Sequence, residues 1–198
     1  TQVISLDVLA VTDGADLSTS QTNLTLNEDA TIVISSFLSA TLISNDANPG
    51  NDVDGSERYT YSVAGLPVGS VVTIDGTPTT ITSIFQVVTS SARSTSTPPA
   101  MSIKPPLNFS GDMNGIKVTL RTIDTDTDST GVISPVNDDV FLNLHVTPAA
   151  GDVSATGTTT LEDTATAFLA GVSITDISAG SEVINSVSFT VPSGWVVT

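Results

Sequence analysis

Apolar and polar residues alternate in two segments of the chain, and this alternation predicts β-strands. Within residues 116–121 and 140–146, apolar side chains occupy every second position: Ile116, Val118 and Leu120, then Val140, Leu142, Leu144 and Val146. Successive side chains of a strand point to opposite faces, so each segment would bury one face and leave the other in solvent. Shorter patterns of the same kind predict further strands at residues 31–35, 59–63, 71–74 and 81–88.

Clusters rich in Gly, Pro, Asn, Asp and Ser separate these segments. They occupy residues 45–52, 54–57, 65–69, 95–100, 105–115 and 134–139. Residues 35–44 carry the one plausible helical period, which favours a short helix or a turn across the sandwich. Short strands divided by such turns are typical of a β-sandwich with Greek-key connections. The sequence therefore predicts an all-β, immunoglobulin-like (Ig-like) sandwich.

An internal repeat predicts how the chain is organised. TLNEDAT, DGSE and GLPVGSVVT recur in the same order as TLEDTAT, AGSE and TVPSGWVVT, the first set within residues 25–73 and the second within residues 160–198. Recurrence in order indicates a duplicated structural unit. We therefore expect three parts: residues 1–16 as the tail of a preceding repeat or a linker, 17–150 as a complete sandwich, and 151–198 as a partial second repeat. The partial repeat holds about three strands, so we expect later sequence or another chain to complete it.

Composition excludes several classes of function. The chain has 21 acidic and 5 basic residues, a net charge of −16, which does not suit binding to nucleic acid or to an anionic membrane. It has no Cys and one His, which excludes disulfides, thiolate metal sites and histidine clusters. With 39% hydrophobic residues it is too apolar for a disordered acidic tail. We expect a soluble fragment of a longer chain, with no membrane-spanning segment.

The acidic residues fall into three clusters. Asp124, Asp126 and Asp128 alternate, while residues 45–57 and 137–139 hold the other two groups. Like charges this close repel one another unless a cation neutralises them. Calcium accepts six to eight oxygen ligands from irregular loops, so these clusters predict Ca²⁺ as a cofactor. The alternative is that solvated acidic loops simply keep the chain soluble.

Several short strings, taken together, resemble a known family. They are the Glu-Asp pairs at 28–29 and 162–163, DGSE at 54–57, PPLNFSGD at 105–112 and VTPAAGD at 146–152. Their order is similar to that of the Ig-like or cadherin-like extender repeats of giant bacterial RTX adhesins. The resemblance implies a secreted, calcium-stabilised extender on the bacterial cell surface, which holds ligand-binding modules away from the cell in adhesion and biofilm formation. The implied partners are neighbouring repeats of the same adhesin, and could include a glycan or protein ligand bound through adjacent modules.

The acidic clusters and the resemblance together give a set of metal ligands. By resemblance, Asp152 and Glu162 would share an ion at the junction with acidic residues of the first repeat. The simpler alternative is that these acids form turns and caps, which is common in loops. The expected calcium ligands are Asp16, Glu28, Asp54, Glu57, Asp124, Asp126, Asp138, Asp152 and Glu162.

No residue pattern indicates catalysis, so we expect that the protein is not an enzyme. His145 falls on the outward face of a predicted strand, and Tyr59 and Tyr61 fit a core better than a sugar platform. Two alternatives stay open. The chain could belong to a split region of the same adhesin that binds a sugar or peptide, or it could be an accessory β-sandwich of an exported hydrolase.

Overall fold

The computed structural model describes residues 2–4, 12–43, 56–125 and 134–149, and beyond them residues 153–154, 164, 173–174, 186 and 193. The chain divides into two compact units, Thr1–Pro148 and Ala149–Thr198. Regular structure in the described residues consists of strands and one short 3₁₀ helix, so the all-β prediction is confirmed. Within the described part, no helix has the length and apolar character needed to cross a membrane.

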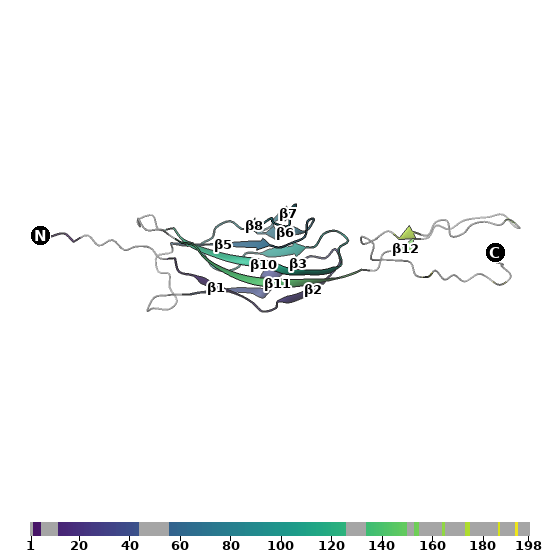
Figure 1. Cartoon of the computed structure of the whole chain (residues 1–198), viewed down its shortest axis with the longest axis horizontal. Helices are drawn as coiled ribbons and strands as arrows, with labels where there is room; N and C mark the ends of the chain where they lie inside the picture. Colours follow the sequence, from purple (N-terminus) through teal and green to yellow (C-terminus); the bar gives the residue numbers. More distant parts are fainter. Residues whose placement is uncertain are drawn as a thin grey trace. The chain divides into compact units, whose positions relative to one another are not determined.

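The first unit contains three sheets (Figure 1). One pairs β1 (Ala15–Thr19) with β4 (Leu38–Leu42). The second has five strands, in the order β2 (Asn23–Asn27), β11 (Val136–Thr147), β10 (Gly111–Asp124), β5 (Glu57–Ala64) and β8 (Val88–Thr89). The third has four, in the order β3 (Ile32–Val33), β9 (Met101–Lys104), β6 (Val71–Ile74) and β7 (Thr77–Thr80). All pairs are antiparallel except β2 and β11, which are parallel.

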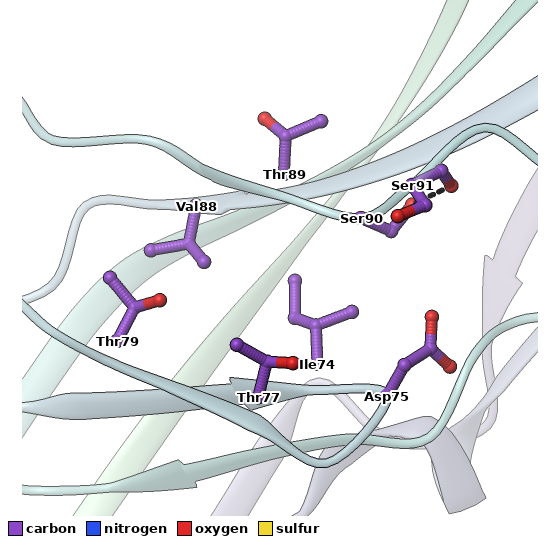
Figure 2. Close-up of a pocket in the computed structure, with 8 residues that line it drawn as sticks. All are labelled: Ile74, Asp75, Thr77, Thr79, Val88, Thr89, Ser90 and Ser91. Carbon is purple, nitrogen blue, oxygen red and sulfur yellow. Dashed lines mark hydrogen bonds between the residues drawn. The ribbon is translucent and has the colours of Figure 1, made fainter.

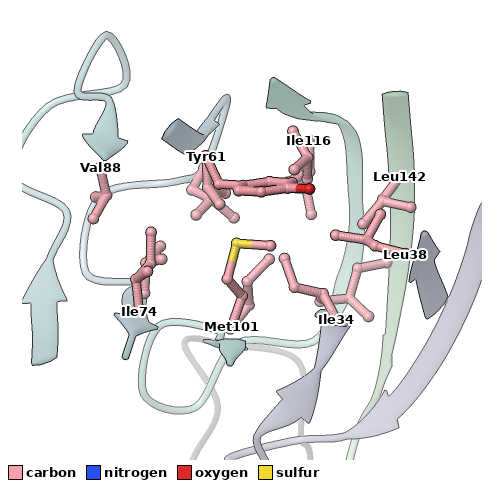
Figure 3. Close-up of a cluster of buried hydrophobic side chains, with 14 of the residues drawn as sticks. Ile34, Leu38, Tyr61, Ile74, Val88, Met101, Ile116 and Leu142 are labelled. Atoms are coloured by element: carbon pink, nitrogen blue, oxygen red, sulfur yellow. The ribbon is translucent and has the colours of Figure 1, made fainter. Parts of the chain in front are cut away.

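The two larger sheets face each other across one hydrophobic core (Figure 3). Tyr61 and Ile116 of the five-stranded sheet lie opposite Ile74 and Met101 of the four-stranded sheet. The smaller sheet adds apolar side chains of its own, including Leu38. Alternation along β10 and β11 places the apolar positions in this core, as the sequence predicts. The sandwich layering thus follows from period-two patterning in the longest strands.

One predicted strand, at residues 81–88, is wrong, and another, at residues 31–35, is too long. Residues 81–88 form a loop, and only β8 at its end pairs with another strand. The Gln86 side chain explains this, because its Oε1 accepts hydrogen bonds from Thr82 N at 2.8 Å and Thr82 Oγ1 at 3.0 Å. These bonds close the loop on itself and keep it out of the sheet. The strand predicted at residues 31–35 is limited to β3, because a 3₁₀ helix follows it at once.

That helix, η1 (Ile34–Phe37), lies where the sequence favoured a short helix or a turn. It buries Ile34 in the core and leads directly into β4. The prediction for residues 35–44 is therefore partly correct, since residues 35–37 are helical and residues 38–42 form β4.

The second unit contributes two short described strands. β12 (Val153–Ser154) pairs antiparallel with β13 (Ser173–Ile174). The rest of the predicted partial repeat lies almost wholly outside the described residues.

Ser70 gives a first testable expectation. It is fully buried, and its hydroxyl has no hydrogen-bond partner among the described residues. Because a buried unsatisfied hydroxyl costs about 1–3 kcal/mol, Ser70→Ala should raise the free energy of unfolding, by about 1 kcal/mol, in urea denaturation. Ser90→Ala is the matched control, since Ser90 Oγ accepts a bond from Tyr61 N and donates one to Ser91 O. That variant should be destabilised, and a loss of stability in both would contradict the expectation.

Candidate functional site

Four acids of the predicted calcium set lie toward one end of the first unit, which we call the acidic end: Asp16, Glu57, Asp124 and Asp138. The register of β5 and β10 places Glu57 directly opposite Asp124. Both residues are only 4% exposed. The sequence grouped Asp124 with Asp126 and did not pair it with Glu57, because that pairing depends on strand register.

Hydrogen bonds show what several of these acids do. Leu17 N donates to Asp138 Oδ2 at 2.6 Å, and Asp13 N donates a longer bond to Glu57 Oε1 at 3.4 Å. Asp124 N donates to Thr12 Oγ1 at 3.2 Å. Each bond ties β1, or the segment before it, to the five-stranded sheet. The acidic end therefore fixes the start of the fold to strands that follow much later in the chain.

The calcium assignment has no support in the described residues. They contain no group of three or more His, Cys, Asp or Glu side chains that could hold a metal ion. Glu28 directly follows β2, where its N–H donates to Thr147 O at the end of β11, so it lies away from the acidic end. Asp54, Asp126, Asp152 and Glu162 lie outside the described residues. The described part of the chain thus does not bring the nine predicted ligands together. Binding of Ca²⁺ stays a prediction.

Asp138 supplies a second testable expectation. Asp138→Ala removes the acceptor of Leu17 N, and a hydrogen bond to a charged group contributes about 1.5–3 kcal/mol. We expect the free energy of unfolding to fall by about 2 kcal/mol, and amide exchange at Leu17 to accelerate.

Asp138→Asn, which keeps a side-chain oxygen acceptor, should lose less stability. Asp139→Ala is the neighbouring control. The hydrogen bond from Thr119 is the largest cause that lowers the pKa of Asp139. Burial opposes it, and the hydrogen bond and charge of Lys117 lower the pKa further. The side chains of Lys117 and Asp139 are 42% and 35% exposed, so water screens their pairing, which should contribute about 1 kcal/mol or less. An Asp139 variant with the larger loss would contradict the role given to Asp138.

A small pocket lies between β7 and β8 (Figure 2). Its volume is about 160 Å³. The lining carboxylate, Asp75, accepts a hydrogen bond from Arg93 Nη2 at 2.6 Å. The lining has one carboxylate and no His or Cys, so it offers no pair of groups for general acid–base chemistry. It is lined by Ile74, Asp75, Thr77, Thr79, Val88, Thr89, Ser90 and Ser91.

His145 is a surface residue, as the sequence predicts. It lies on β11 with its Nδ1 2.5 Å from Asp112 Oδ1 on β10, and both side chains are more than half exposed. Tyr59 and Tyr61 are buried, which confirms their placement in the core.

The chain is similar to one structural family over its central part. Residues 54–135 match the family of the D3 domain of flagellar hook-associated protein 1. This segment is about two-fifths of the chain and contains every strand from β5 to β10. The chain matches none of the curated proteins with which it was compared.

The match corrects the adhesin assignment. The extender function, the RTX, adhesion and biofilm roles, and the adhesin repeats and ligands expected as partners are wrong, because the matched domain is a flagellar one. Three strings of the first repeat lie inside the matched segment: DGSE, GLPVGSVVT and PPLNFSGD. Gly69 and Asn108, in two of these turns, have φ values of 92° and 55°. Tight turns in many protein families require residues that tolerate a positive φ. The strings therefore indicate turns, and they do not indicate membership of an adhesin family.

Proposed function

We propose that this chain is a structural domain of an exported flagellar assembly, with the flagellar hook as its partner, and that it has no enzymatic activity. The observation that carries the proposal is the match of residues 54–135 to the D3 domain of a hook-associated protein. That segment supplies strands to both large sheets, so the similarity covers both layers of the sandwich. A location outside the cell follows from the same proposal.

The geometry of the first unit supports a structural role. Its core side chains from β5, β10 and β11 are almost fully buried, and long strands connect the two ends of the unit. Two acids of the acidic end, Glu57 and Asp138, serve as acceptors that hold the fold. In the part of the chain that the structure describes, the pocket between β7 and β8 lacks the groups for acid–base catalysis.

We also propose that the second unit repeats the Ig-like fold of the first. The segments that precede the two copies also match, VTDGADLS at residues 11–18 against VTPAAGDVS at residues 146–154, and this match aligns Leu17 and Ser18 with Val153 and Ser154. In β1 and β4, Ser18 lies opposite Ser39, and in β12 and β13, Ser154 lies opposite Ser173. In each copy, the aligned Ser of the first strand therefore lies opposite another Ser. This shared register supports a tandem arrangement more directly than the similarity of strings does.

Immunoelectron microscopy tests the flagellar proposal. Antibody raised against residues 1–198 should label intact cells that produce the protein at the hook region of their flagella. Cells without flagella should lose the label. Labelling spread over the cell surface, or labelling that persists without flagella, would overturn the proposal.

A further inference from the structure

Asn114 and Gly115 form a β-bulge in β10. The pairing of β10 with β11 shifts between Met113 and Ile116, so the two bulge residues lie opposite Asn143 alone. Gly115 has a φ of 73°, which glycine adopts without strain. Both bulge residues are exposed, whereas Met113 and Ile116 on either side are buried in the core. The bulge is therefore a solvent-facing kink in the middle strand of the five-stranded sheet.

An Asn followed by Gly is chemically reactive without an enzyme. The backbone nitrogen of the glycine attacks Cγ of the Asn and forms a C–N bond. The side-chain nitrogen takes up the proton that the glycine nitrogen loses and leaves as ammonia. Water then opens the succinimide ring, at one carbonyl to give Asp and at the other to give isoaspartate. Glycine favours the attack because it has no Cβ to hinder the approach, and in this chain Asn114 is followed by Gly while no other Asn is.

Asn143 on β11 restrains the attacking nitrogen. Its Oδ1 accepts a hydrogen bond from Gly115 N at 3.1 Å. A peptide nitrogen is a poor nucleophile until it loses its proton, because its lone pair is delocalised into the carbonyl group. The hydrogen bond shields that proton from hydroxide and directs the N–H toward β11. It must therefore open before Gly115 N attacks Cγ of Asn114, and such local opening is a small fraction of the folded population.

We propose that Asn114 is a site of spontaneous deamidation and that Asn143 controls the rate of this reaction. The hydrogen bond to Asn143 keeps the reaction slow in the folded chain, and deamidation proceeds when β10 and β11 separate locally at the bulge. The isoaspartate product adds a methylene group to the main chain between Met113 and Ile116, which are both buried in the core. Deamidation therefore weakens the packing of a central strand. This inference goes beyond the flagellar proposal and does not depend on it.

Mass spectrometry of the full chain, incubated near neutral pH and then digested briefly with trypsin, tests the proposal. The tryptic peptide that ends at Lys117 contains Asn114, and fragmentation places the change at that residue. The folded chain should deamidate more slowly than a synthetic peptide of residues 110–118, which lacks Asn143. Asn143→Ala should raise the rate in the folded chain about 2- to 10-fold, the range that one neutral hydrogen bond contributes to an opening equilibrium. Amide exchange at Gly115 should accelerate by a similar factor.

Asn23→Ala is the matched control. Asn143 Nδ2 donates to Asn23 Oδ1 at 3.0 Å, so this variant removes the other side-chain hydrogen bond of Asn143 and leaves the acceptor of Gly115 N in place. It should change the rate at Asn114 by less than about twofold, because the opening at Gly115 is unaffected. Asn143→Asp keeps a side-chain oxygen acceptor and should also stay close to the parent chain.

Three results would overturn the proposal. The first is an Asn143→Ala variant that deamidates no faster than the Asn23→Ala variant. The second is a folded parent chain that deamidates as fast as the synthetic peptide, which would show that the bulge gives no protection. The third is deamidation at other Asn residues of the incubated chain while Asn114 stays intact.

Discussion

Gly65→Ala is expected to lower the free energy of unfolding by about 2–5 kcal/mol, through two effects that act at the same residue. Gly65 directly follows β5 and has a φ of 82°, a conformation that disfavours any side chain. An added Cβ would also lie 2.9 Å from the carbonyl oxygen of Gly115. Backbone cannot move aside as a flexible side chain can, so β5 and β10 would have to separate locally.

Gly76→Ala separates the two effects. Gly76 has a φ of 79°, and an added Cβ there would meet nothing within 4 Å. This variant should lose only about 1–2 kcal/mol, the cost of the left-handed backbone. Urea denaturation of both variants measures the difference. Equal losses would show that the sheet absorbs the contact with Gly115 without cost.

The second large effect is a loss of stability at alkaline pH that depends on Tyr61. Tyr61 is fully buried and its hydroxyl donates to the carbonyl oxygen of Ser96. Burial raises the pKa of Tyr61 from 10.0 to about 12; the charge of Arg93 opposes this rise and Tyr59 adds to it. Between these pH values the unfolded chain loses the phenol proton while the folded chain keeps it. Stability is therefore complete below pH 10 and falls by about 2–3 kcal/mol toward pH 12.

Tyr61→Phe isolates this contribution. The variant should be less stable than the parent chain at pH 7, by about 1 kcal/mol, because it lacks the hydrogen bond to Ser96. Its stability should then fall less steeply between pH 10 and 12, because no buried phenol titrates. Urea denaturation at intervals of half a pH unit measures both slopes. Parallel curves for the two proteins would contradict the assignment to Tyr61.

Strands could be predicted where one face is consistently apolar. The positions from Ile116 to Leu120, and from Leu142 to Val146, alternate over several residues, and each faces the core as expected. Residues 81–88 are also apolar, but Ile84 and Phe85 are adjacent and both lie in solvent. Their structure depends on hydrogen bonds from one side chain, Gln86, which a hydrophobic pattern does not reveal.

The candidate site was harder to predict because it depends on contacts between distant segments. Proximity in sequence placed Asp124 beside Asp126, whereas strand register places it opposite Glu57. Asp138 was selected as a metal ligand, and the structure shows it as an acceptor for Leu17 N. A carboxylate suits either role, and only its neighbours in space decide between them.

The parallel pairing of β2 with β11 determines how the first unit would respond to tension along the chain. Asn23 lies opposite Asn143 and Asn27 opposite Thr147, so five consecutive residue pairs join the two strands. Pulling the start of β2 and the end of β11 in opposite directions would slide the strands past each other and load these pairs together. Unzipping would instead break them one at a time. Tension applied across β2 and β11 would therefore be resisted by five residue pairs at once.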